Sequence, residues 1–238
     1  RGPLPRTGQQ LARELHRLLD RAGIPGPYIL VGHSLGGLVT RLYRQEHPRD
    51  VIGMVLVDAG HTLEMRQLEF RSFTHAAQSM LPIMRTMTIL GIPRLMMSFD
   101  KLPPLLAEQE AKVPESIRPM LRAGWLRTGS VATLADEGSA LIETLEQVRR
   151  TDSLGDLPLV VVTATAPVWW PDMPGQVNPV KFRKMWLDLQ QDLTTLSSNS
   201  HQVLADRSGH FIQFDQPSMV IEVIRQMVDN TRQPSRSR

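Results

Sequence analysis

Apolar residues recur along the chain with two different spacings, which predict a succession of helices and strands. Between residues 8 and 22 they follow the period of one helix face, at Leu11, Leu15, Leu18, Leu19 and Ala22. Residues 23–27 are rich in Gly and Pro and predict a turn after this helix. Continuous apolar runs at 28–31 and 51–57 then predict two short strands that are buried on both faces.

The second half of the chain repeats this pattern. Apolar runs at 158–162 and 202–205 predict a third and a fourth strand, and residues 219–228 predict a closing amphipathic helix. The polar tail from residue 230 is expected to be disordered. Strands that alternate with helices and read as continuous apolar runs are typical of a parallel sheet covered on both faces. The predicted fold class is therefore α/β.

Residues 60–150 have an irregular helical pattern, which predicts a helical cap inserted over one edge of the sheet. The core would then comprise residues 1–59 and 151–230, with 231–238 as the tail. Prolines at 82, 93, 103 and 104 are expected to break the apolar segment 81–106. We expect its side chains to pack between cap helices, with an apolar pocket for acyl chains as the alternative: Met84, Met87, Leu90, Ile92, Leu95, Met96 and Met97. Charged residues interrupt this segment, so a membrane-spanning helix is not expected.

Composition narrows the function classes. The 238 residues include no cysteine, which excludes a disulfide scaffold, a zinc finger and a cysteine nucleophile. The 27 Lys and Arg residues against 24 acidic residues form no basic stripe with interleaved aromatics, so nucleic-acid binding is not expected. The sequence shows no signal-peptide pattern, and the cytoplasm is the default expectation. It gives no indication of the oligomeric state.

A Gly-rich segment between the first strand and the next helix is the strongest chemical motif. Residues 32–37 read Gly-His-Ser-Leu-Gly-Gly, which matches G-x-S-x-G in its strand-to-helix context. The motif predicts a sharp, strained turn that exposes the hydroxyl of Ser34 as a nucleophile. Gly32 and Gly36 are expected to prevent collisions across this turn. The backbone N–H of Leu35, at the start of the helix, would stabilise an oxyanion.

Here the sequence resembles the α/β-hydrolase superfamily over nearly its whole length. The matching segments are residues 28–37, 55–59 (Val-Leu-Val-Asp-Ala), 208–210 (Ser-Gly-His) and 215–217 (Asp-Gln-Pro). The resemblance implies a mostly parallel sheet flanked by helices, a cap, and no metal or organic cofactor. It also implies catalytic residues in the chain order nucleophile, acid, histidine.

The resemblance suggests the other two members of a catalytic triad. His210 lies between the last strand and the closing helix and would be the general base. Two residues are candidates for the acid of the triad: Asp58, at the end of the second strand, and Asp172, beyond the third strand. Asp58 is preferred. His33 lies within the turn but is expected to point elsewhere. The remaining histidines are assigned no catalytic role: His16, His47, His61, His75 and His201.

The resemblance also implies segments that this sequence does not contain. Family members have four strands before the strand of the nucleophile, or on the order of 80 residues, whereas 33 residues precede Ser34. The loop that supplies a second oxyanion N–H has no match. We therefore expect an N-terminally truncated hydrolase that is weakly active or inactive.

The function that these patterns predict is hydrolysis of a carboxylic ester, or a related acyl bond, in a small apolar substrate. A serine at the turn, in place of aspartate, disfavours the dehalogenase and epoxide-hydrolase branches of the superfamily. Acyl transfer and peptide cleavage on the same fold stay open. A non-catalytic binding module is the alternative from another class, and membrane contact through residues 80–106 is a weaker one.

Overall fold

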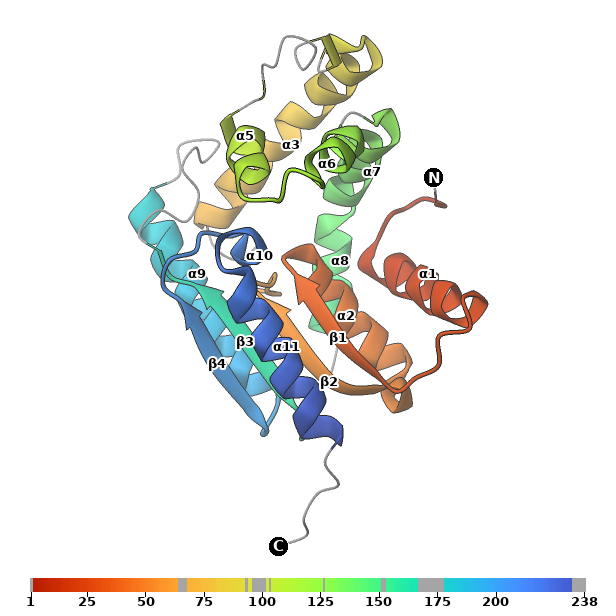
Figure 1. The fold of residues 1–238 in the computed structure, drawn as a ribbon, viewed down its shortest axis with the longest axis vertical. Helices are drawn as coiled ribbons and strands as arrows, with labels where there is room; N and C mark the ends of the chain where they lie inside the picture. Colours follow the sequence, from red (N-terminus) through yellow and green to blue (C-terminus); the bar gives the residue numbers. More distant parts are fainter. Residues whose placement is uncertain are drawn as a thin grey trace, which may run out of the picture.

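The computed structural model describes residues 2–63, 68–92, 94–95, 102, 104–125, 127–150, 153–166 and 178–232 (Figure 1). Its elements, in chain order, are α1 (Gly8–Arg21), β1 (Tyr28–His33), α2 (Leu35–Glu46), the 3-10 helix η1 (Pro48–Asp50), β2 (Val51–Val57), α3 (Leu68–Ile89), α5 (Pro104–Ala111), α6 (Arg118–Trp125), α7 (Thr128–Ser139), α8 (Leu141–Arg149), β3 (Leu159–Ala164), α9 (Pro179–Leu193), η3 (Thr194–Leu196), β4 (Ser200–Ala205), α10 (Ile212–Asp215) and α11 (Pro217–Arg232).

The four strands form one parallel sheet in the order β1-β2-β3-β4. Val55 of β2 is in register with Val31 of β1 and with Val160 of β3. Parallel strands place their carboxyl ends at one edge of the sheet, where ligands bind in α/β folds. The segments after β1, β2 and β4 therefore meet at this edge, and the α/β prediction is confirmed.

The core follows the alternation of side chains along the central strands. Met54 and Leu56 belong to one buried cluster, together with residues of α1, α2 and α8. Val55 and Val57 belong to a second cluster, which includes Phe182 and Trp186 of α9 and Val223 of α11. Figure 1 shows α11 crossing one face of the sheet. Strands covered in this way explain why β2 and β3 are continuous apolar runs.

Strand β1 departs from the prediction of burial on both faces. The side chain of Val31 is 42% exposed, although it is part of the apolar run. Among the described strands β1 ends the sheet order, so it has a strand neighbour on one side only. A continuous apolar run indicates full burial only where neighbouring elements cover the strand, and here they do not cover Val31.

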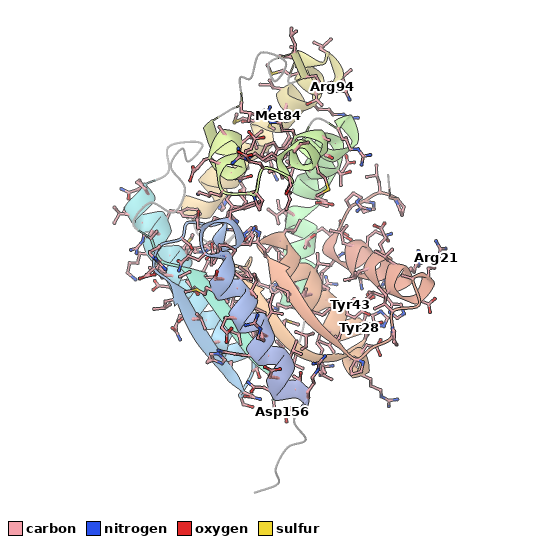
Figure 2. The ribbon with its side chains drawn as sticks, in the orientation of Figure 1. Arg21, Tyr28, Tyr43, Met84, Arg94 and Asp156 are labelled. Carbon is pink, nitrogen blue, oxygen red and sulfur yellow. The ribbon has the colours of Figure 1, made fainter. Side chains whose placement is uncertain are left out.

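Helices α3, α5, α6 and α7 lie beyond the carboxyl edge of the sheet (Figure 1). The prediction that Pro82 breaks this segment is wrong, because α3 continues through it. Met84, Met87 and Leu90 are exposed, so the expected packing between helices is also wrong for these side chains. Figure 2 shows Met84 and Arg94 in the part of the molecule farthest from the sheet. Met96 and Met97 lie outside the described residues.

Helix α8 lies within the 60–150 segment but packs against the core. Thr144 accepts a hydrogen bond at Oγ1 from the N–H of Gly8, at 2.8 Å. Leu145 and Val148 of the same helix belong to the buried cluster with α1 and α2. The division into core and cap at these boundaries stays a prediction.

The C-terminal helix is longer than its sequence pattern indicates. The hydrophobic pattern predicts residues 219–228, whereas α11 extends to Arg232. The prediction of disorder from residue 230 is therefore wrong for residues 230–232. Residues 233–238 lie outside the described part of the chain. Across the described helices, none has both the length and the apolar character needed to span a membrane.

Candidate active site

Ser34 occupies the sharp turn between β1 and α2. Its backbone has φ 53° and ψ −123°, a left-handed conformation that costs energy for any residue with a Cβ. Its N–H donates to the carbonyl oxygen of Val57 at 3.2 Å, and its own carbonyl oxygen accepts from Gly37 and Gly60 at 3.0 and 2.9 Å. Contacts from both β2 and α2 therefore hold the strained residue in place.

Two glycines make this turn possible. A Cβ on Gly32 would lie 2.6 Å from the carbonyl oxygen of Gly36, and a Cβ on Gly37 would lie 2.4 Å from the Cβ of Ala59. The expectation for Gly32 is confirmed. The expectation for Gly36 is wrong, because a Cβ there would meet no atom within 4 Å. Gly37, which the sequence did not single out, is the second glycine that the close approach of α2 to β2 requires.

His210 lies between β4 and α10, and its ring is directed at Ser34. Its Nε2 is 3.0 Å from Ser34 Oγ. The side chain is 7% exposed, which keeps the imidazole largely out of water. The edge of the ring faces Trp186, with centroids 5.9 Å apart. The structure thus brings together the two residues that the sequence predicts as nucleophile and base.

Asp58 completes a continuous hydrogen-bonded chain. The residue is fully buried, and its Oδ2 is 2.7 Å from Nδ1 of His210. Its Oδ1 accepts from the backbone N–H of Ala164 and from the indole Nε1–H of Trp186, both at 3.0 Å. The other candidate acid, Asp172, lies outside the described residues. Asp58 is the acid that the described structure places against His210.

These contacts define the tautomer of the imidazole. An ionised carboxylate only accepts hydrogen bonds, so Nδ1 of His210 carries the proton that is donated to Asp58. In the neutral ring Nε2 then has a free lone pair, which accepts the hydroxyl proton of Ser34. This is the arrangement in which a histidine can remove a proton from a serine.

His33 is closer to the site than expected. The prediction that it points elsewhere is wrong, because its ring centroid is 4.6 Å from that of His210. Its Nε2–H donates to the backbone carbonyl oxygen of His210 at 2.8 Å. Burial, followed by the nearby imidazole of His210, lowers the pKa of His33 to about 4, so the ring is neutral near pH 7.

The loop that carries His210 is held from its C-terminal side. Gln216 accepts at Oε1 from the hydroxyl of Ser208, at 2.8 Å, and from the N–H of Arg207. Asp215 accepts at Oδ2 from the N–H of Gly209, at 3.0 Å. The Asp-Gln-Pro segment that opens α11 therefore fixes the loop on which the imidazole depends.

Lys112 links α5 to this same loop. Its ammonium group pairs with Asp215, whose other oxygen accepts from Gly209. The position of α5, beyond the edge of the sheet, is thus connected to the His210 loop through one carboxylate.

Leu35 is the first residue of α2. The first N–H groups of a helix have no acceptor within that helix, and the helix dipole makes this end favourable for negative charge. The N–H of Leu35 follows Ser34 directly, as an oxyanion donor requires.

Trp186 is the contact of Asp58 that sequence reasoning missed. It lies in the middle of α9, where its spacing with Phe182 and Leu189 indicates only a buried helix face. No local pattern marks its indole N–H as a donor to a residue 128 positions away. Gln216 belongs to a segment that matches the superfamily, so the sequence did mark this position. Its hydrogen bonds to Ser208 and Arg207 could not be predicted from the sequence.

Comparison with known proteins gives one family. The family model described as "Alpha/beta hydrolase family" matches residues 2–223. A superfamily protein of Gibberella zeae is 22% identical over 96% of this chain and 73% of its own length. Protein YqjL of Bacillus subtilis is 24% identical over 90% of this chain and 62% of its own length. A 56-residue stretch is 46% identical to a Hormonema carpetanum protein named as a probable transporter, but it spans only 8% of that protein.

Solved structures share the fold at low identity. MenH from S. aureus aligns with a TM-score of 0.59 and 19% identity, over 98% of this chain and 80% of that one. The epoxide hydrolase CorEH aligns with a TM-score of 0.60 and 14% identity, over 98% and 78% of the two chains. An esterase from Thermogutta terrifontis aligns with a TM-score of 0.51 and 17% identity, over 98% and 75%.

Proposed function

Because the chain belongs to the alpha/beta hydrolase family, we propose that it is a serine hydrolase that cleaves a carboxylic ester or a related acyl bond. The observation that carries the proposal is the continuous chain of contacts from Ser34 Oγ through the ring of His210 to the buried carboxylate of Asp58. The contacts have the lengths of real hydrogen bonds, at 3.0 and 2.7 Å.

The first half of the proposed reaction acylates Ser34. His210 takes the hydroxyl proton at Nε2 as Ser34 Oγ attacks the acyl carbonyl carbon. The negative charge on the carbonyl oxygen is stabilised by the N–H of Leu35 and by the start of α2. The tetrahedral intermediate collapses when His210 returns the proton to the leaving alcohol, which breaks the ester bond.

The second half releases the acid. His210 removes a proton from water as the water oxygen attacks the acyl carbon bound to Ser34. The second tetrahedral intermediate collapses when the bond from the acyl carbon to Ser34 Oγ breaks and His210 returns the proton to Oγ, which releases the acid. The imidazolium that forms in each half carries a positive charge next to Asp58. The carboxylate stays ionised and stabilises this charge, and its bonds from Ala164 and Trp186 keep it oriented toward His210.

Helices α3, α5, α6 and α7 are proposed to form a cap under which the substrate binds. They lie beyond the edge of the sheet at which Ser34 and His210 meet (Figure 1). Lys112, which directly follows α5, ties this segment to the loop of His210. The acyl group is proposed to be small and apolar, and the residues that would select it are not assigned.

Two other functions would use the same site differently. An acyltransferase would pass the acyl group from Ser34 to an alcohol or amine in place of water. A non-catalytic binding module would use neither the serine nor the imidazole. The hydrogen bond between Ser34 and His210 supports catalysis over simple binding, since binding alone does not require it.

The direct test is turnover of p-nitrophenyl acetate and butyrate by the purified chain. We expect hydrolysis that Ser34→Ala lowers by at least about a thousandfold, because loss of the nucleophile removes most triad catalysis. The matched control is Ser218→Ala, at an exposed serine at the start of α11, which should keep full activity. Turnover unchanged in Ser34→Ala would contradict the proposal.

A further inference from the structure

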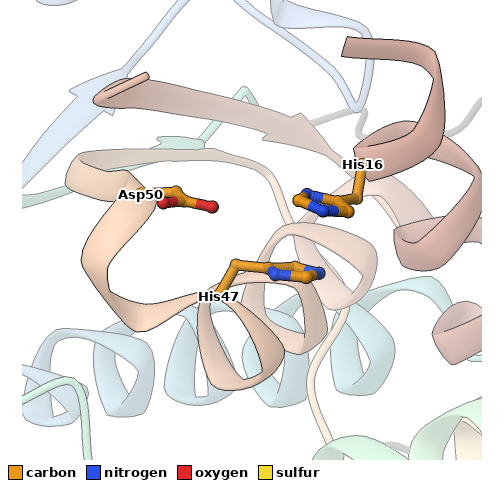
Figure 3. A group of neighbouring side chains, drawn as sticks. All are labelled: His16, His47 and Asp50. Carbon is orange, nitrogen blue, oxygen red and sulfur yellow. The ribbon is translucent and has the colours of Figure 1, made fainter. Parts of the chain in front are cut away.

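A second group of chemically capable side chains lies outside the candidate active site. His16 of α1, His47 at the end of α2 and Asp50 of η1 each offer one ligand atom, and these atoms all lie within 4.8 Å of one another (Figure 3). The three residues come from different elements and meet only in the folded chain. Each is half-buried, so the group is accessible to solvent but not spread over an open surface.

The two imidazoles lie parallel. The ring centroids of His16 and His47 are 3.8 Å apart, with only 10° between the ring planes. Figure 3 shows the rings one above the other, with the Asp50 carboxylate directed toward them. In this stacked arrangement the in-plane lone pairs of the two rings run parallel, so one ring has to rotate out of the stack before both nitrogens can bind a single ion.

The ligand atoms lie farther apart than in a bound site. Zinc–ligand bonds of about 2.0–2.1 Å place the ligand atoms of a tetrahedral site roughly 3.3 Å apart. The atoms of this group, which lie within 4.8 Å of one another, would have to approach by up to about 1.5 Å, through rotation of an imidazole out of the stack.

Tyr43 supports the orientation of one ligand. Its hydroxyl is 3.4 Å from Nδ1 of His16, and its ring is fully buried in the core. A contact at one nitrogen of a metal-binding histidine commonly fixes the ring and leaves the other nitrogen for the metal. Tyr43 also packs against the ring of His47, with centroids 5.0 Å apart, so one buried side chain braces both imidazoles.

The surroundings would admit an ion. A hollow of about 280 Å³ lies beside the group and is lined in part by His16, Asp20 and Tyr28. Of the three proposed ligands His16 alone lines this hollow, which has room for water as a further ligand. Asp20 adds a second carboxylate at this hollow, which favours the approach of a cation.

We propose that His16, His47 and Asp50 bind a divalent transition-metal ion of the zinc type. Two imidazoles and one carboxylate suit this class, because hard ions such as Mg²⁺ and Ca²⁺ prefer oxygen ligands alone. Three protein ligands leave a fourth position for water. The site binds the ion between α1 and the connection from α2 to β2.

The site is distant from the proposed chemistry. Ser34 precedes the first residue of α2 and His47 follows the last one, and the twelve residues between them span roughly 18 Å. The ion would therefore hold α1 against the C-terminal end of α2, the helix that begins directly after Ser34. Its role is structural, and removal of the metal should leave the triad in place.

The alternative is that the stacked rings only pack the interface between α1 and α2. Zinc titration of the full chain by isothermal calorimetry, after treatment with EDTA and its removal, separates the two. We expect one saturable zinc ion per chain. His47→Ala and Asp50→Asn should weaken binding by more than the roughly 10- to 100-fold that loss of an outer partner costs.

The control is His201→Ala, which removes an exposed histidine on β4 and should leave zinc affinity unchanged. Circular dichroism identifies the variants that fold. If His47→Ala does not fold, Asp50→Asn carries the test, because it changes only the charge and one oxygen of an accessible side chain. No saturable binding by the parent chain, or the same affinity in a folded ligand variant, would overturn the proposal.

Thermal unfolding gives an independent readout. An ion that binds only the folded chain raises its stability by about 2.7 kcal/mol at a concentration 100 times the dissociation constant. We expect zinc to raise Tm in the parent chain and in His201→Ala but not in Asp50→Asn. Equal rises in all three would show that zinc binds elsewhere and would contradict the site.

Discussion

His33 donates a hydrogen bond from Nε2 to the backbone carbonyl oxygen of His210, across 2.8 Å. The donor precedes Ser34 in the chain, and the acceptor belongs to the residue whose ring contacts Ser34 Oγ. One bond thus joins the turn of Ser34 to the loop of His210. It restrains the distance between the hydroxyl and the imidazole in addition to their own contact.

Loss of this bond should lower catalysis without abolishing it. A typical hydrogen bond contributes about 0.5–1.5 kcal/mol, so His33→Ala should reduce kcat by about 2- to 12-fold. His33→Gln keeps an N–H donor on a side chain of similar reach and should recover part of the loss. Steady-state ester hydrolysis measures both variants, and an unchanged kcat in folded His33→Ala would count against the positioning role.

The lowered pKa of His33 should also make the folded chain less stable at acidic pH. The folded pKa of His33 is about 4, while its ordinary value is 6.5. Above about pH 6.5 both states are neutral and the folded chain keeps full stability. Between pH 6.5 and 4 the unfolded chain binds a proton that the folded chain does not, so stability falls, by at most on the order of 3 kcal/mol.

Urea unfolding at pH 7 and pH 4.5 measures this component. His33→Gln cannot titrate and should lose less stability between the two values than the parent chain. His201→Gln, at an exposed site on β4, should behave as the parent does. A parallel pH dependence of His33→Gln and the parent would contradict the assignment.

Two neighbouring glycines should respond in opposite ways to the same substitution. The Cβ of Gly37→Ala would meet Ala59 at 2.4 Å and force α2 away from β2, which should destabilise the fold by about 1–3 kcal/mol. Gly36→Ala adds a Cβ in open space, and alanine favours a helix by about 1 kcal/mol, so stability should hold or rise. Chemical denaturation of the pair is the measurement, and equal losses would refute the steric explanation.

Trp186→Phe should show what the indole N–H contributes to Asp58. The ring stays apolar and aromatic, but Oδ1 of Asp58 loses the indole N–H donor, while the donor from Ala164 stays. Hydrogen bonds to charged groups contribute about 1.5–3 kcal/mol, so both stability and kcat should fall. Phe182→Leu, in the same helix, is the packing control. It should lower stability while leaving kcat closer to that of the parent.

Local sequence patterns predicted the parts of the site that depend on chain order. Ser34 was predictable because a nucleophile turn needs glycines at fixed offsets between a strand and a helix. The resemblance pointed to His210 and left the acid open between Asp58 and Asp172. Asp58 and His210 each follow a strand whose carboxyl end reaches the same edge of the parallel sheet. Adjacent strands β1 and β2 place Ser34 and Asp58 side by side. The order of the strands along the chain was therefore enough to predict that these two residues are neighbours.

Contacts between distant elements could not be predicted in this way. The bond from Trp186 to Asp58 depends on how α9 packs, and the bond from His33 depends on the course of the loop after β4. The sequence treats Trp186 as one apolar residue among others on a helix face. Pro82 shows the opposite error, since this local helix breaker lies inside α3 and the helix continues through it.

The central claim is that Ser34 is a nucleophile activated by His210 and Asp58. Covalent labelling with a fluorophosphonate probe, followed by mass spectrometry of the labelled peptide, tests it most directly because it requires no knowledge of the substrate. The account predicts one label per chain, on Ser34, with none on Ser34→Ala and labelling at least about 100-fold slower in His210→Ala. Absence of label on Ser34, or an equal labelling rate in His210→Ala, would contradict it.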